Sequence, residues 1–156
     1  MPSFPDIIVT SPDSPRVLIA VEAKMASTHI ENAAQQMRHY MAKMSCPVGL
    51  VVLPKELYIY RNRYTGLDER AIDEIGHYQL GDTFQMFVHL SAKSSPNAKE
   101  HWFENYVQDW LEHLPNSDEI KRLPAELRDA LETHVVPVLE SGIVRATGPR
   151  EMRSTS

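Results

Sequence analysis

An uninterrupted apolar run at 17–21, Val-Leu-Ile-Ala-Val, constrains the fold of this chain more than any other feature. A strand without polar alternation is typical of burial on both faces, so the segment 16–24 is predicted to be a central strand. A second apolar run at 48–53 has the same character. Between them, residues 30–44 carry apolar side chains at helical spacing, which predicts a helix that connects two buried strands.

Two shorter segments complete this pattern. Residues 7–10 are an apolar run that a proline-containing turn at 11–15 separates from the central strand. Residues 57–60 follow the second buried strand after a tight connection and read as a more exposed strand. The order strand–strand–helix–strand–strand predicts an α/β fold, an α+β sandwich with a mixed central sheet of about four to five strands flanked by helices.

The rest of the chain is expected to be mainly helical. Broad apolar helical faces predict helices at 100–114 and 124–141, and Pro137 should kink or end the second one. The segment 71–80 fits either a strand or a loose helix, and a strand is favoured. Composition predicts two further segments, a short helix at 83–90 that Asp82 caps and a loop at 91–99.

The length of 156 residues leaves room for one domain with a sizeable core. We expect a core at 1–64, a helical extension at 65–145 packed on it, and a flexible tail at 146–156.

No apolar stretch approaches the roughly 20 residues that span a bilayer, and the first residues do not have the pattern of a signal peptide. Cys46 is the one cysteine and is interpreted as a small half-buried residue rather than a catalytic thiol. These features predict a cytoplasmic protein without a membrane partner.

Polar side chains lie at the ends of the predicted strands and on the predicted helix. Asp6 opens the first strand, and Glu22 and Lys24 close the central one. If the two strands pair as a hairpin, the carboxylates of Asp6 and Glu22 converge at one end of the sheet, and alternation puts Lys24 on the same face as Glu22. Gln36 and Tyr40, four residues apart, share one face of the helix.

These residue types suit metal-dependent hydrolysis of a phosphodiester. A divalent cation held by hard oxygen ligands activates a water and neutralises charge at phosphorus, and a lysine can orient the water or stabilise that charge. Each residue also has an ordinary interpretation. Glu22 and Lys24 could form a surface ion pair worth about 0–1 kcal/mol, and Gln36 and Tyr40 could be a helix flank packed on the sheet.

Over about residues 4–62, this arrangement resembles the PD-(D/E)xK nuclease superfamily, in particular its Gln-x-x-x-Tyr branch. That branch includes RecB-like nucleases and the N-terminal nuclease domains of type I restriction enzyme motor subunits. The resemblance implies a DNA substrate and a role in restriction, repair or defence. It implies that Lys24 acts on the attacking water and that Mg²⁺, for which Mn²⁺ can substitute, is the metal. The implied metal ligands are Asp6, Glu22 and the backbone carbonyl of Ala23, and the implied supporting or DNA-contacting residues are Gln36 and Tyr40.

The chain departs from this family at its beginning. The family core usually starts with a helix, often carrying a further acidic residue, and a strand before the Pro-Asp pair, whereas five residues precede Asp6 here. We therefore expect a restriction-endonuclease-like core that lacks its first helix and strand, unless the C-terminal helices replace them or the chain is a fragment. An open hairpin edge would favour a homodimer or assembly into a larger restriction or repair subunit.

The net charge of −5 is unfavourable for a dedicated nucleic-acid binder, although bound Mg²⁺ would offset part of it. The main interpretation is an endonuclease or exonuclease. The alternative is a catalytically inactive nuclease-fold module for DNA binding or subunit assembly. The presence of Asp6, Glu22 and Lys24 together favours the enzyme, because a binding module does not need a lysine beside two acids. The choice between DNA and RNA stays open.

Overall fold

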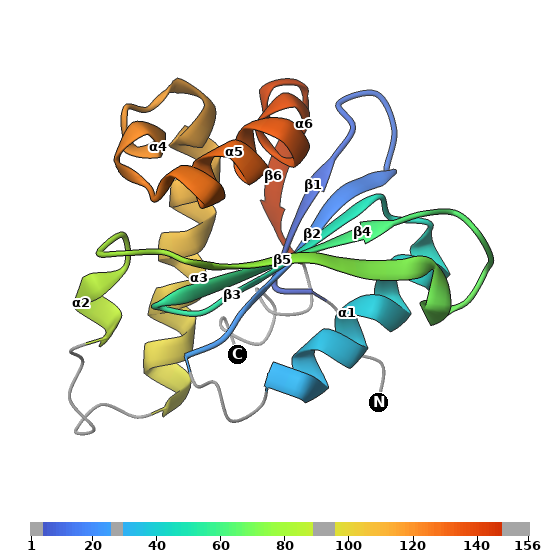
Figure 1. Ribbon diagram of the computed structural model, residues 1–156, viewed down its shortest axis with the longest axis horizontal. Helices are drawn as coiled ribbons and strands as arrows, with labels where there is room; N and C mark the ends of the chain where they lie inside the picture. Colours follow the sequence, from blue (N-terminus) through green and yellow to red (C-terminus); the bar gives the residue numbers. More distant parts are fainter. Residues whose placement is uncertain (1–4, 26–29, 89–95, 148–156) are drawn as a thin grey trace.

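A mixed sheet of six strands in the order β5-β4-β3-β2-β1-β6 forms the centre of the computed structural model, which describes residues 5–25, 30–88 and 96–147 (Figure 1). The predicted α+β class and mixed sheet are confirmed, with six strands in place of the expected four to five. The predicted strand at 71–80 is also confirmed. The strands are β1 (Ile7–Thr10), β2 (Val17–Ala23), β3 (Val48–Val52), β4 (Glu56–Asn62), β5 (Ile72–Gln79) and β6 (Ile143–Ala146).

The only parallel neighbours in the described sheet are β2 and β3, and helix α1 (Ile30–Met44) connects them. A parallel pair requires such a crossover, whereas antiparallel neighbours such as β1 and β2 need only a turn. The carboxyl ends of β2 and β3 therefore lie at the same end of the sheet. Because β1 runs antiparallel to β2, its first residues lie at that end as well.

Side-chain alternation along β2 divides the core into two layers. Ala20 packs in a cluster with Met37 and Met41 of α1 on one face of the sheet. Ile19 and Val21 belong to the larger cluster on the other face, which is built mainly from the C-terminal helices. Figure 1 shows α1 on one side of the sheet and α5 (Ala125–His134) and α6 (Val136–Ser141) on the opposite side.

Strand β6 covers the edge of β1 that the sequence suggested would be open. The two strands pair antiparallel from Thr10 opposite Ile143 to Ile7 opposite Ala146. The segment 65–145 is therefore not purely helical, since it contains β5 and most of β6, and the predicted tail begins too early at 146. The exposure of β6 alternates between exposed and half-buried, so the sequence carries no core signal there. Residues 148–156 lie outside the described part.

The helices differ from the prediction in their boundaries. Helix α3 (Pro96–His113) begins four residues before the expected start at 100, because a proline is well tolerated in the first helical turn. The expected helix at 124–141 is broken after His134, where Pro137 cannot supply an N–H to a continuous helix. The short elements are η2 (Glu69–Ala71), α2 (Gln85–Val88), η3 (Leu114–Asn116) and α4 (Glu119–Arg122).

Two further expectations concern the ends of elements and the membrane. From the sequence, Ser27 or Thr28 can cap the helix that follows, and both residues lie outside the described part of the chain. Within the described residues, no helix has the length and apolar character needed to cross a bilayer.

Candidate active site

Asp6 and Glu22 are both buried where β1 begins and β2 ends, with 2% and 4% of their surface exposed. The backbone N–H of Asp6 donates to the carbonyl of Val21 at 2.9 Å, which ties Asp6 to β2. In return, the N–H of Ala23 donates to Asp6 Oδ2 at 2.7 Å. These bonds hold the Asp6 carboxylate at the end of β2, next to the residue that follows Glu22. The first strand and the central strand thus pair as the predicted hairpin, and both acids lie at the same end of the sheet.

Lys24 follows β2 and lies with its ammonium Nζ 3.5 Å from Glu22 Oε2. Its N–H donates to the carbonyl of Val52 at 2.9 Å, so the chain continues along β3 for one residue beyond β2. Burial acts to lower the pKa of Lys24, but the negative charges of Glu22, Asp6 and Glu100 act the other way and the net result is a raised pKa. Lys24 is consequently a cation at neutral pH.

Glu100, on helix α3, is a member of this site that the sequence did not indicate. Its Oε2 accepts a 2.7 Å hydrogen bond from the N–H of Met25, one residue after Lys24. Its charge also acts on Lys24. Glu100 is separated from Met25 by 75 positions, and the sequence around Glu100 predicts only an amphipathic helix. No local motif could have placed this carboxylate beside the end of β2.

Gln36 and Tyr40 are half-buried on α1, as the shared helix face predicted. Burial, with a further contribution from Cys46, raises the pKa of Tyr40 to about 12. Cys46 lies before β3, at the end of that strand opposite to the carboxylates. Among the described residues, neither Gln36 nor Tyr40 forms a hydrogen bond or ion pair with the Asp6–Glu22–Lys24 cluster. The fold thus brings together three of the five predicted side chains, and leaves these two without a direct link to them.

The residues at this site fit a hard divalent cation with few protein ligands. Within the described ranges, no group of three or more His, Cys, Asp or Glu side chains is arranged to hold a metal ion. Mg²⁺, however, is commonly bound through one or two carboxylates, with waters and substrate phosphates as the other ligands. Asp6 and Glu22, with the carbonyl of Ala23, offer oxygen ligands of this kind.

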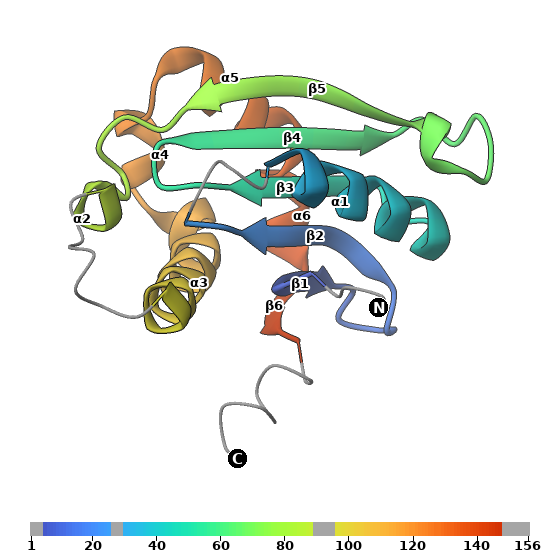
Figure 2. The ribbon, with the colours of Figure 1, turned by 90° about the horizontal axis from the view of Figure 1, so that it is seen from below.

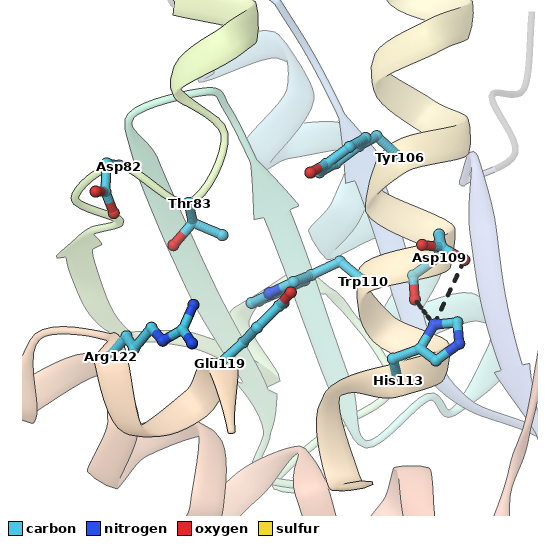
Figure 3. A pocket seen from close by; sticks show the side chains of 8 residues that line it. All are labelled: Asp82, Thr83, Tyr106, Asp109, Trp110, His113, Glu119 and Arg122. Atoms are coloured by element: carbon cyan, nitrogen blue, oxygen red, sulfur yellow. Dashed lines mark hydrogen bonds and ion pairs between the residues drawn. The ribbon is translucent and has the colours of Figure 1, made fainter. Parts of the chain in front are cut away.

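A separate concavity of about 440 Å³ lies beside α3 and α4 (Figure 3). Trp110 forms part of its wall together with charged side chains such as Asp109 and Arg122, and none of its lining residues belongs to the carboxylate cluster. The predicted apolar face of this helix is only partly correct. Trp110 is buried, whereas Trp102 and Tyr106 are exposed at its flank. The aromatic residues of α3 therefore belong to the core or to another surface, away from the site.

Comparison with known proteins found no matching family model, no matching curated protein and no matching solved structure. The chemistry of the site therefore follows from its own residues and geometry.

Proposed function

We propose that this protein is a Mg²⁺-dependent nuclease that hydrolyses phosphodiester bonds of DNA. The observation that carries the proposal is the cluster of the buried Asp6 and Glu22 with the half-buried Lys24 at one end of the sheet. Two carboxylates provide the hard oxygen ligands that a divalent cation needs, and a lysine beside them can stabilise charge on a phosphate. A bare surface ion pair would have both partners in solvent, whereas Glu22 is almost fully buried.

Each residue has a defined task in this proposal. A divalent cation supplies charge neutralisation at the phosphate and lowers the pKa of its bound water. Asp6 and Glu22 would hold that cation, and the bond from Ala23 N–H fixes the orientation of the Asp6 carboxylate. Because Lys24 is protonated at neutral pH, its ammonium donates hydrogen bonds to the water or to a phosphate oxygen and stabilises the charge that develops there.

The C-terminal half has two features that resemble what usually accompanies the Pro-Asp pair in the PD-(D/E)xK superfamily. Strand β6 pairs antiparallel with β1 and so lies along the outer edge of the hairpin. Glu100, on α3, brings an acidic side chain to the site from a helix. Both features match what the superfamily core usually has beside its Pro-Asp pair. Glu100 would act on the metal through its charge and not as a third side-chain ligand.

The test is a cleavage assay of the purified chain on linear, circular and single-stranded DNA with Mg²⁺ or Mn²⁺. Cleavage should disappear with EDTA and in Lys24→Ala, and it should persist in Lys43→Ala, which removes an exposed lysine from the last turn of α1. If the wild-type chain is folded by circular dichroism and cleaves nothing, the nuclease proposal is wrong. The inactive module for DNA binding or assembly is then the better interpretation.

A further inference from the structure

A stacked aromatic pair lies on the sheet outside the carboxylate cluster. The rings of Tyr58 on β4 and His77 on β5 are parallel to within 7°, and their centroids are 4.1 Å apart. Nε2 of His77 lies 2.9 Å from Oε1 of Glu56, which fixes the orientation of the imidazole. The His77 side chain is 39% exposed. The pair is therefore a rigid aromatic surface that solvent reaches.

The register of the sheet places this pair in line with the proposed active site. Glu22 pairs with Val51, Val51 with Tyr58, and Tyr58 with His77. Residues that pair across neighbouring strands project from the same face. Val51 and Tyr58 pack in the cluster that contains α1, so the whole row projects on the α1 side. With strands about 4.8 Å apart, Tyr58 lies about 10 Å from Glu22 and His77 about 14 Å.

Helix α1 does not lie over this end of the sheet. Figure 2, which views the molecule from the α1 side, shows the helix across the half of the sheet away from the end of β2. The outer face of the His77 ring points away from Tyr58 and toward the edge, because β5 is the outermost strand. Among the described strands, none lies beyond β5 on the side of that ring face.

We propose that Tyr58 and His77 form a stacking platform for an unpaired base of a single-stranded DNA substrate, one of whose phosphodiesters lies at Asp6, Glu22 and Lys24. This inference rests on the proposed nuclease function and names its substrate class. The distance of about 14 Å from Glu22 to His77, whose outer ring face is the open one, corresponds to about four nucleotide steps at the 3.4 Å rise of a stacked strand. One strand can thus reach from the carboxylates to the platform.

The chemistry of the platform favours a single strand over a duplex. A base inside a duplex is stacked on its neighbours, so its flat face is open to a protein ring only when the strand is unpaired. Both forms of DNA are polyanions, but the electrostatic contribution per contacted phosphate is smaller for a single strand than for a duplex, so the net charge of −5 is less unfavourable for a single strand. Stacking on aromatic rings adds affinity that only an unpaired base can use.

The experiment measures binding directly, with Ca²⁺ in place of Mg²⁺ and under conditions where the DNA is recovered intact. The probes are a fluorescent 12-mer of thymidine and its duplex with the complementary strand, followed by fluorescence anisotropy. His77→Ala should weaken binding of the single strand by at least about fivefold, the lower end of the loss for one base–aromatic stack. His77→Phe keeps a flat ring without the contact to Glu56, so its affinity should stay within about twofold of the wild type.

Trp102→Ala is the matched control, since it removes an exposed aromatic ring that lies on α3. Its affinity for the single strand should equal that of the wild type, and circular dichroism should show each variant folded.

Equal affinity of His77→Ala and the wild type, or equal losses in His77→Ala and Trp102→Ala, would overturn the platform. So would tighter binding of the duplex than of the single strand. If wild type cleaves DNA with Mg²⁺ in these cases, the nuclease function stands and only the platform fails; if the folded wild type neither binds nor cleaves DNA, both proposals fail.

Discussion

The carboxylate of Glu100 accepts a hydrogen bond from the backbone N–H of Met25, at 2.7 Å and across 75 positions of sequence. This bond attaches the start of the long helix α3 to the end of β2, directly beside Lys24. It shows that the C-terminal half takes part in the site and does not merely cover the core. The proposed active site therefore depends on contacts between residues far apart in sequence, and its parts can be tested separately.

Glu100→Gln should weaken metal use without unfolding the protein. The amide oxygen of glutamine can still accept the bond from Met25, so the change in the free energy of unfolding should stay below about 1 kcal/mol. Loss of the charge should raise the Mg²⁺ concentration for half-maximal cleavage about tenfold. The assay is cleavage as a function of Mg²⁺, with the exposed Glu112→Gln of the same helix as control. An unchanged Mg²⁺ dependence would limit Glu100 to a structural role.

Lys24→Met should change the dependence of stability on pH. The folded pKa of Lys24 lies above its ordinary value of 10.5, because the charges of Glu22, Asp6 and Glu100 outweigh the effect of burial. A raised pKa stabilises the folded state fully below the unfolded pKa, and this contribution is lost as pH rises through the folded pKa. Since the side chain is 31% exposed, the expected difference from the wild type is about 1 kcal/mol. Urea unfolding from pH 7 to 11 should show that difference shrinking above about pH 10.5. A difference that grows above that pH contradicts the assignment.

Gly142→Ala should loosen the connection between α6 and β6. A Cβ at this position would lie 2.5 Å from Cγ1 of Val9 and 2.9 Å from the carbonyl oxygen of Val138. Such overpacking costs about 1–3 kcal/mol. The measurement is the midpoint of urea unfolding. Gly66→Ala is the control, because nothing lies within 4 Å of the added Cβ, and its stability should be unchanged or slightly higher. Equal midpoints for the two variants would show that β1 and β6 adjust without cost.

Cys46 should be unreactive in the folded protein. Burial raises the pKa of its thiol from 9.0 to about 12, against smaller opposing effects that include hydrogen bonds with Val48 and Ala20. At neutral pH this lowers the thiolate fraction about a thousandfold relative to a free thiol. A thiol-specific reagent should therefore label the chain slowly in buffer and rapidly in concentrated urea. Fast labelling of the native chain would mean that the thiol is accessible, and would reopen its interpretation as a reactive group.

The core strands and the first helix were predictable because their apolar patterns are local. The run at 17–21 and the spacing of Met37 and Met41 each reflect the face that the element buries. Strand β6 was not predictable, since Ile143 is exposed and the strand is held mainly by pairing with β1. For the candidate site, Asp6, Glu22 and Lys24 could be grouped from the sequence because each stands at a strand end. Gln36 and Tyr40 were grouped with them by helix spacing, which does not determine what a helix face contacts.

The sequence alone determined the class of the fold and the residue types of the candidate site, because burial patterns and strand ends are properties of short segments. Tertiary structure alone decided that β6 covers β1 and that Glu100 reaches Met25. It also decided that Tyr58 and His77 stack in the same cross-strand row as Glu22. Each of these relationships depends on strand register or helix docking between distant segments. The free energy that sets them comes from packing of the whole core and not from any local propensity.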